Sequence, residues 1–358
     1  MKFVFWQNIL SPHQCDFIST LANKHEVTLI VMSKVDKHRQ SQHWQSSYSD
    51  KVKVIVAPSF YHILRELKTN QKDTFHCFSG FFAYPMLSFV LFLSSFYRKN
   101  NIIVSEAVSL MGSKGKIKFL IRKCLSLIFN SRISQVFAIG SSGVSYFKKL
   151  GFNNSKVSEF GYFVFPPALR KKKTNEYQYV TFVGRLIELK GIKQLLNMCL
   201  LIKDADIKVK IIGGGPLKSF ISNFLIKHEL DFVELLSDMP RVEVLEVIGS
   251  AESLLLPNTG DEGWGVVVNE ALLQGTPVIC SKKTGANVVV AKNQGVILSD
   301  VSAIEIKNAV EYCLKLNRGD IKSVAMEQLT PEVGASYFVQ QLSDKDACPP
   351  WNNEGVKG

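Results

Sequence analysis

The sequence predicts an α/β protein made of two doubly wound domains. In both halves of the chain, short apolar runs typical of strands alternate with segments of helical periodicity, which is the pattern of a parallel sheet covered by helices. This alternation breaks once, at Pro166 and Pro167 and the three lysines from 171 to 173. The 358 residues are enough for two full cores. The expected parts are a first domain over 1–165, a linker over 166–177, a second domain over 178–342 and a loose tail over 343–358.

The strands expected in the first half are runs rich in β-branched and aromatic residues. They cover residues 2–6, 27–32, 52–56, 74–78, 102–105, 136–139 and 157–162. Helices are expected near residues 15–24, 81–97, 114–132 and 142–150, and an exposed polar loop over 33–50. In the second half, strands are expected at 179–183, 207–212, 232–235, 253–256 and 278–279, with a last helix over 331–342.

The charge is unevenly distributed between the halves. The net charge is +12, but residues 1–170 hold 22 Lys+Arg against 8 Asp+Glu, whereas residues 171–358 hold 21 against 23. A basic first half suits an anionic partner, either nucleic acid or an anionic membrane leaflet. Because the chain has no zinc-like cysteine pair and no base-reading motif, the membrane is favoured over nucleic acid. Seven cysteines without paired spacing suit a reducing compartment.

Two apolar segments bear on the membrane question. The first residues lack the apolar core and cleavage site of a signal peptide. Residues 81–97 are at the short limit for a membrane span and contain Pro85, so a core or interfacial helix is expected, with entry into lipid as the alternative. In residues 114–132, Lys116, Lys118, Arg122 and Lys123 lie mostly opposite the apolar side chains and near Phe119, which suits a membrane surface; an ordinary surface helix is the alternative.

The residues from Asp261 to Ala271 form the candidate functional stretch of the second half. Glu262 and Glu270 stand eight positions apart, with the turn Gly263-Trp264-Gly265 and Val266 between them. The expected order of strand, loop and helix places the loop at the carboxyl end of a strand, where open α/β sheets bind ligands. Free amide groups there favour an anion such as a diphosphate. If the stretch is mostly helical, the two carboxylates lie roughly 12 Å apart. A solvated turn with an ordinary surface glutamate is the alternative.

Two further turns follow predicted strands of the second half. Gly184 and Arg185 end the strand at 179–183, and Lys190 opens the next helix. Arginine and lysine across such a turn can reach one diphosphate, although both could also be ordinary surface cations. Three glycines that include Gly214 follow the strand at 207–212, and they allow a ligand to approach the backbone closely.

These motifs carry a specific resemblance. The runs F-V-G-R-L-x4-K-G, I-I-G-G-G-P, E-G-W-G-x4-E-A and G-T-P-V-I, over about residues 179–290, resemble the C-terminal domain of retaining nucleotide-sugar glycosyltransferases of family 4. The resemblance implies the GT-B fold, in which two Rossmann-like domains face each other across a cleft. It also implies that Arg185 and Lys190 neutralise the donor diphosphate, that Glu270 binds the ribose and that Glu262 lies beside the sugar. The amides of 263–266 would meet sugar and phosphates, Gly184 and Gly214 would leave room for the nucleotide, and the base would lie near residues 239–241.

The first domain departs from this family pattern. Many members have a histidine where this chain has Glu106, so the usual contact to the donor needs another residue or role. His13, on the first loop of the domain, is a further candidate for the acceptor side, while His76 and Ser105 are nearby residues expected to be structural. The expected reaction is transfer to a polyprenyl-diphosphate-linked saccharide during surface polysaccharide synthesis, by a cytoplasmic enzyme held on the inner face of the membrane.

No cofactor or metal is expected, because the cations and amides serve the phosphates and the Asp204–Asp206 pair precedes its strand. Two other functions compete with transfer. A dinucleotide-dependent oxidoreductase is disfavoured, because the G-x-G-x-x-G pattern fails at Lys218. A non-catalytic protein that binds nucleotide sugars remains open.

Overall fold

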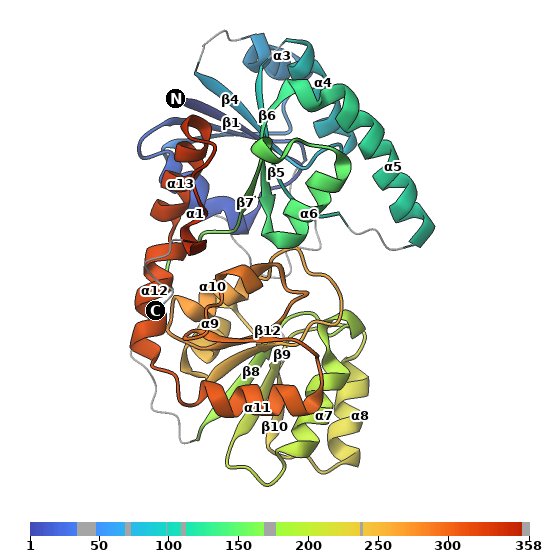
Figure 1. The fold of residues 1–358 in the computed structure, drawn as a ribbon, viewed down its shortest axis with the longest axis vertical. Helices are drawn as coiled ribbons and strands as arrows, with labels where there is room; N and C mark the ends of the chain where they lie inside the picture. The colour runs from blue at the N-terminus through green and yellow to red at the C-terminus, as the bar shows by residue number, and fades with distance from the viewer. Residues whose placement is uncertain are drawn as a thin grey trace. The chain divides into compact units, whose positions relative to one another are not determined.

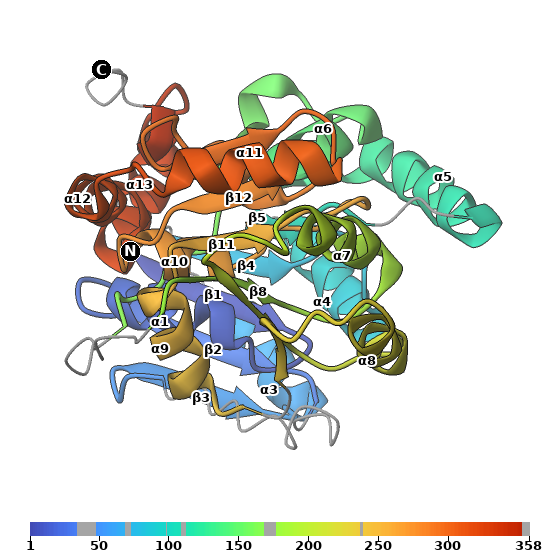
Figure 2. The same cartoon turned by 90° about the horizontal axis from the view of Figure 1, so that it is seen from below.

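The computed structural model describes residues 1–33, 48–68, 73–97, 99–108, 112–167, 177–236 and 239–352, without the side chain of Lys114. The chain divides into two compact units, each a parallel sheet with helices on both faces (Figures 1 and 2). Among the described residues, unit 1 comprises those within 1–164 and 331–352, and unit 2 comprises those within 165–330. Most of the expected loop over 33–50, most of the linker, including its three lysines, and the last six residues of the tail lie outside the described residues.

Unit 1 contains a seven-stranded sheet in the order β3-β2-β1-β4-β5-β6-β7. Its strands are β1 (Lys2–Gln7), β2 (Glu26–Val31), β3 (Val52–Val56), β4 (Thr74–Ser79), β5 (Asn100–Glu106), β6 (Ile133–Ile139) and β7 (Val157–Phe160). Its helices are α1 (Pro12–Leu21), α3 (Phe60–Lys68), α4 (Pro85–Phe96), α5 (Gly112–Phe129), α6 (Gly140–Leu150) and α13 (Pro331–Ser343), with short 3-10 turns at Asn130–Arg132, Asn154–Lys156 and Pro350–Asn352.

Alternation along β1 shows how the sheet of unit 1 is covered on both faces. Val4 and Trp6 point to the face packed by α3, α4 and α6, whereas Phe3 and Phe5 point to the opposite face. There Phe338 of α13 lies 5.6 Å from Phe3 and 6.4 Å from Phe5 between ring centroids. Both sets of side chains are buried, as expected for a strand in the centre of a parallel sheet.

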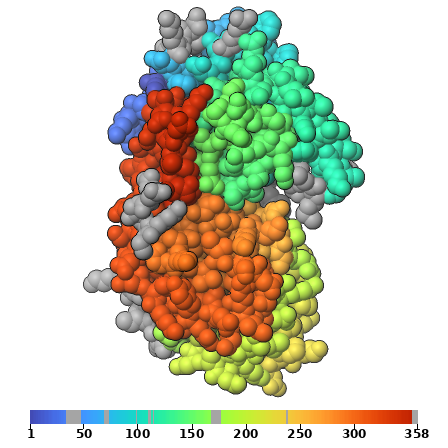
Figure 3. All heavy atoms as spheres, in the orientation of Figure 1, coloured from blue at the N-terminus to red at the C-terminus, as the bar shows by residue number. Residues whose placement is uncertain are grey.

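The position of α13 corrects the expected domain boundary. The sequence places residues 331–342 in the second domain, but α13 packs in unit 1, and Figure 3 shows it beside residues of the middle of the chain. The reason is a row of aromatic contacts, because the Phe338 ring stacks 4.4 Å from Phe137 and lies 5.3 Å from Phe17. The expected loose tail is also wrong for its described part, since Trp351 is buried and its indole N–H donates to Glu159 at 3.2 Å.

The orientation of α5 corrects part of the expectation for residues 114–132. Lys116, Lys118 and Lys123 are exposed as expected, but Arg122 is buried and the apolar side of the helix is exposed as well. Phe119, Arg122, Ser126 and Phe129, at spacings of three and four, form the side that packs on unit 1. Arg122 is 8% exposed, and its Nε donates to the carbonyl oxygen of Phe82 at 3.3 Å. This buried arginine turns the other side of the helix, with its isoleucines and leucines, toward solvent.

Unit 2 contains a six-stranded sheet in the order β10-β9-β8-β11-β12-β13. Its strands are β8 (Tyr179–Val183), β9 (Lys208–Ile212), β10 (Val233–Leu236), β11 (Ser253–Leu256), β12 (Val278–Ser281) and β13 (Gly295–Leu298). Its helices are α7 (Ile192–Leu201), α8 (Lys218–Lys227), α9 (Arg241–Ser250), α10 (Val267–Leu272), α11 (Ala303–Cys313) and α12 (Arg318–Leu329), with 3-10 turns at Glu188–Lys190 and Gly285–Val289. All paired strands are parallel, so both units have the predicted architecture.

Candidate functional site

The predicted residues of unit 2 follow three neighbouring strands, β9, β8 and β11, and the loop after the next strand, β12, lies beside them. In the order β9-β8-β11-β12, the strands end at Ile212, Val183, Leu256 and Ser281. The chain moves outward from β8 to β10 and then returns to β11 on the other side of β8. This reversal is the topological switch point at which open α/β sheets bind ligands.

Backbone hydrogen bonds join the loop after β8 to the loop after β11. The N–H groups of Thr259 and Gly260 both donate to the carbonyl oxygen of Leu189, at 3.0 and 3.1 Å. Gly191 makes this approach possible, because its φ is 70° and a Cβ there would lie 1.8 Å from the carbonyl oxygen of Pro257. The contact fixes Lys190, which immediately precedes this glycine, beside the end of β11.

Lys190 and Glu262 form an ion pair at this edge of the sheet. The Lys190 ammonium contacts Oε1 of Glu262, and the amide of Asn258 donates to Oε2, so both carboxylate oxygens are held. The two charged side chains are only 16% and 23% exposed. Asn258 also donates to the hydroxyl of Thr284 at 2.9 Å. The structure therefore unites two predicted residues and adds Asn258 and Thr284, which the sequence reasoning missed.

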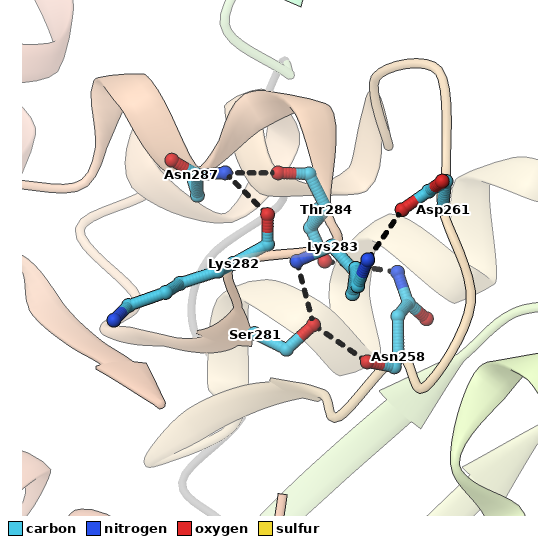
Figure 4. Close-up of polar contacts among 7 residues, drawn as sticks. All are labelled: Asn258, Asp261, Ser281, Lys282, Lys283, Thr284 and Asn287. Carbon is cyan, nitrogen blue, oxygen red and sulfur yellow. Dashed lines mark hydrogen bonds and ion pairs between the residues drawn. The ribbon is translucent and has the colours of Figure 1, made fainter. Parts of the chain in front are cut away.

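The loop after β12 holds the Glu262 loop from the other side. The N–H of Glu262 donates to the carbonyl of Lys283 at 2.9 Å, and the N–H of Gly285 donates back to the carbonyl of Glu262 at 3.1 Å. Figure 4 shows the surrounding polar contacts, among them the Lys283–Asp261 ion pair at 3.0 Å and the Ser281 hydroxyl donating to the Asn258 carbonyl at 2.7 Å. Glu262 is thus positioned by backbone pairing on both sides.

The turn between the two glutamates is irregular until α10 begins at Val267. Val266 is the residue before this six-residue helix, and Gly265 has a φ of 94° and lies beside the Glu262 carboxylate. The 12 Å spacing expected for a mostly helical stretch therefore does not apply. Trp264 is buried and donates its indole N–H to Asn269 at 2.8 Å, so only the backbone of this tryptophan remains a candidate for ligand contact.

Glu270 forms a second ion pair, with Arg241 at the start of α9. Nη2 of Arg241 lies 2.7 Å from Oε1 of Glu270, whose side chain is 7% exposed against 41% for the arginine. Arg241 belongs to the segment where the base was expected by family analogy. Its guanidinium offers charge compensation for a buried carboxylate, which would otherwise be costly.

The glycine turn after β9 packs directly on the backbone after β8. A Cβ added to Gly213 would lie 2.0 Å from the carbonyl oxygen of Gly184, so the two backbones are in close contact. In addition, the N–H of Leu186 donates to the carbonyl of Gly214 at 2.9 Å. A Cβ on Gly214 would meet nothing within 4 Å, so this residue borders open space. Arg185 is exposed between these turns and makes no ion pair with a described residue.

In unit 1, the candidates Glu106 and His13 both contact Tyr162. Tyr162, just after β7, donates its hydroxyl to Oε1 of Glu106 at 2.8 Å, and its ring lies 5.5 Å from the ring of His13. Sequence reasoning missed Tyr162. All three residues lie at the carboxyl edge of the sheet, because Glu106 ends β5 and His13 is in the first turn of α1, after β1.

His76 and Ser105, the other two residues considered in unit 1, make hydrogen bonds within the unit 1 sheet. His76 is buried and accepts a hydrogen bond from the Trp6 indole at 3.1 Å. Burial, and then the charges of Lys99 and Lys2, lower the pKa of His76 to about 3. The Ser105 hydroxyl donates to the Glu106 carbonyl at 2.9 Å. Among the described residues, no group of three or more His, Cys, Asp or Glu side chains is placed to hold a metal ion.

Two Rossmann-like units with these turns define a protein of the GT-B fold. Residues 167–328 match the family model described as Glycosyl transferases group 1. An uncharacterized glycosyltransferase of Methanocaldococcus jannaschii is 29% identical over 157 residues, which cover 44% of this chain and 40% of that protein. The chain thus spans about two fifths of the length of that curated relative.

Solved structures support the fold over 96% of the chain. The Anabaena protein HepE, in complex with UDP, has a TM-score of 0.72 at 15% identity, covering 96% of this chain and 100% of its own. The lipopolysaccharide outer core galactosyltransferase WaaB has a TM-score of 0.68 at 15% identity, with the same coverage. At this level of identity, the likeness establishes the fold and leaves the activity to be argued from the site.

Proposed function

We propose that the protein is a glycosyltransferase that moves a sugar from a nucleotide-diphosphate donor to an acceptor with retention of configuration. The observation that carries this proposal is the Lys190–Glu262 pair at the carboxyl edge of the unit 2 sheet. It lies within residues 167–328, which match the glycosyltransferase model, and the Anabaena structural neighbour holds UDP. A carboxylate paired with an ammonium group at a topological switch point suits a nucleotide sugar, because the carboxylate can accept from sugar hydroxyl groups and the ammonium can contact phosphates.

The chemistry follows from where charge develops. The bond between C1 of the sugar and the diphosphate oxygen breaks, so negative charge grows on the leaving phosphate. Lys190 and Arg185, which lie on one turn, would stabilise that charge, together with the backbone amides of 263–266. The acceptor oxygen bonds to C1 on the same face, and its proton passes to the departing phosphate oxygen. Glu262 positions the sugar hydroxyls and the Lys190 ammonium in this scheme, and no separate general base is needed.

Glu270 would bind the ribose of the nucleotide. Its carboxylate can accept from two hydroxyl groups. Arg241 pairs with Oε1 of Glu270, and from this position its guanidinium would also contact the nucleotide base or a phosphate. Gly214 borders open space, which suits a nucleotide lying against the glycine turn.

A panel of nucleotide sugars tests the donor site. We expect one donor to raise the melting temperature of the protein, because ligand that binds only the folded state stabilises it. The Glu270→Gln variant should bind that donor about tenfold more weakly, since it loses a charge-assisted hydrogen bond. Glu243→Gln is the matched control, because this glutamate is exposed on α9 and should change the affinity little. Equal affinities of both variants and the unmutated protein would contradict the assigned role of Glu270.

We further propose that unit 1 contacts an anionic membrane surface and that the acceptor is a polyprenyl-diphosphate-linked saccharide used for surface polysaccharide such as O-antigen or capsule. A lipid-linked acceptor would be presented at the cytoplasmic face of the membrane. Among the described residues, no helix has both the length and the apolarity needed to cross a bilayer. The outer side of α5 supports a peripheral contact, because its exposed apolar residues are accompanied by exposed Lys116, Lys118 and Lys123.

The apolar surface extends from α5 across its neighbours in unit 1. On α5, Ile117, Leu120, Ile121, Leu127 and Ile128 are each more than half exposed. On α4, Phe92 is 52% exposed and lies 6.3 Å from the ring of Phe129, while Phe89 lies 6.2 Å from Phe60 of α3. Figures 1 and 2 show these three helices along one side of unit 1, with α5 projecting from it. Exposed apolar side chains that gather on three helices in this way suit an interaction site.

Flotation with phosphatidylglycerol-containing vesicles tests this contact. The variant I117S/L120S/I121S should bind at least about tenfold more weakly, because it removes three side chains that would enter the lipid interface. I226S/I304S is the control, since it removes exposed isoleucines from unit 2. A charge variant should change Lys116, Lys118 and Lys123 and leave the buried Arg122 in place. Binding that survives both the apolar and the charge variants would refute the proposed contact.

A further inference from the structure

A cavity lies at the amino-terminal edge of the unit 1 sheet, opposite the carboxyl edge that carries His13 and Glu106. Its volume is ≈ 330 Å³. Phe75, Ile133 and Leu342 form part of its wall. The charged and polar side chains among its lining residues include Lys99, Arg132, Lys156, Lys345, Ser131 and Gln135. No described aspartate or glutamate lines it, so four cations face one space without an acidic residue in the wall.

The sheet topology explains how these cations meet. Lys99 immediately precedes β5, Arg132 precedes β6 and Lys156 precedes β7. These three strands are consecutive neighbours in the sheet and run parallel, so the residues before them lie at the same edge. Lys345 lies in the turn just after α13, and α13 is joined to β7 by the hydrogen bond that the Ser158 hydroxyl donates to Gln341 at 2.6 Å. Figure 3 shows α13 beside residues from this part of unit 1.

Helix ends account for part of this arrangement. Cations often lie at helix C-termini, whose free carbonyl groups carry partial negative charge. The Lys156 ammonium does donate to the carbonyl oxygens of Asn130 and Ile133, at 2.7 and 2.9 Å. These carbonyls satisfy hydrogen bonds but do not cancel a full charge. Burial, and then the nearby positive charge of Lys345, lower the pKa of Lys156, which is the effect expected where cations are crowded together. The excess of cations over acids among the described lining residues is what favours an anion here.

We propose that this cavity binds a phosphate or diphosphate group as a site separate from the donor site. Arg132 offers a planar fork for two phosphate oxygens, and the lysines offer point charges. The hydroxyl of Ser131 adds a neutral donor. The space is large enough for such a group but stays open to solvent at Arg132 and Lys345, which are exposed. The proposal does not depend on the transfer reaction.

Two sources can supply this chemistry, namely a soluble phosphorylated molecule and the head group of an anionic lipid. The geometry favours the lipid source, because Lys99 follows the exposed end of α4 and Arg132 follows the exposed end of α5. Phe96 is 77% exposed and Ile128 is 67% exposed at these ends. The two sources share the phosphate and differ in whether an apolar chain accompanies it.

Calorimetric titration with inorganic pyrophosphate tests the site. The titration uses the R185A/K190A variant, so that binding at the candidate donor site does not obscure the result. We expect the further change R132Q/K345Q to weaken pyrophosphate binding at least about tenfold, because it removes two cationic contacts. Both residues are exposed, so the fold should tolerate the change. K148Q/K149Q in the last turn of α6 is the matched control, since it removes the same charge from an exposed site of unit 1.

A second arm uses phosphatidylcholine vesicles with and without phosphatidylglycerol. A selective loss of pyrophosphate binding in R132Q/K345Q supports a soluble phosphate ligand. If R132Q/K345Q selectively loses phosphatidylglycerol-dependent vesicle binding, the result supports a lipid head group. The variant I117S/L120S/I121S should then bind pyrophosphate as well as its parent does, because it leaves this cavity intact. Equal effects of R132Q/K345Q and K148Q/K149Q in both arms, or no pyrophosphate binding at all together with no lipid effect, would overturn the proposal.

Discussion

The Glu262→Ala variant is expected to lose sugar transfer by about 10²–10³-fold while it keeps measurable affinity for the nucleotide. Glu262 holds the Lys190 ammonium with one oxygen and accepts from Asn258 with the other. Removing the carboxylate leaves the largely buried Lys190 without its ion-pair partner and frees it to adopt other rotamers. The diphosphate then loses an oriented cation at the moment when charge develops on it.

The measurement compares the initial rate of transfer with nucleotide affinity for the same protein. Asp261→Asn is the matched control, because Asp261 is the adjacent acid and its side chain is 76% exposed in a surface pair with Lys283. Surface pairs of this kind contribute about 1 kcal/mol or less. If Glu262→Ala transferred sugar as fast as Asp261→Asn, the assignment would be wrong. If the unmutated protein bound a nucleotide sugar but transferred it to no acceptor, a non-catalytic binding function would be favoured.

Gly191→Ala is expected to destabilise unit 2 by about 3–5 kcal/mol, which is among the largest effects of a single methyl group. Two costs combine at this residue. A φ of 70° is unfavourable for alanine, and the added Cβ would lie 1.8 Å from the carbonyl oxygen of Pro257. The backbone would have to separate the loops after β8 and β11, which would also move Lys190 away from Glu262.

Differential scanning calorimetry measures this effect as a lower melting temperature of the unit 2 transition. Gly214→Ala is the control, because a Cβ there meets nothing within 4 Å, and its stability should change by less than about 1 kcal/mol. The unit 1 transition should stay in place in both variants. Equal melting temperatures for Gly191→Ala and Gly214→Ala would show that the two loops do not need this close contact.

Much of the local structure could be predicted from the residues alone. Alternating strands and helices predicted two parallel sheets, and the glycine, arginine, lysine and glutamate motifs predicted which strand ends carry the candidate site. Those features depend on short stretches of sequence, in which periodicity and backbone freedom act over a few residues. The structure brings Lys190 and Glu262 into contact, while their roles in a donor site stay a prediction.

Other features depend on contacts between distant segments, which no local pattern encodes. Arg241 meets Glu270 only because α9 and α10 pack together, and Tyr162 meets Glu106 only because β7 follows β6 in the sheet. The basic cavity was missed for the same reason. Its sequence signal is a cation directly before each of three strands, but this signal has meaning only once those strands are known to be neighbours.

The sequence by itself determined the α/β class, the two sheets and the turns that carry charged and glycine residues, because these follow from side-chain periodicity and backbone conformation. Only the tertiary structure decided that α13 returns to unit 1 and that α5 turns its apolar side outward. In both helices the physical reason is packing with distant residues. The Phe338 ring fills an aromatic cluster with Phe17 and Phe137, and Arg122 is buried against the Phe82 carbonyl, so each helix is oriented by partners far away in the chain.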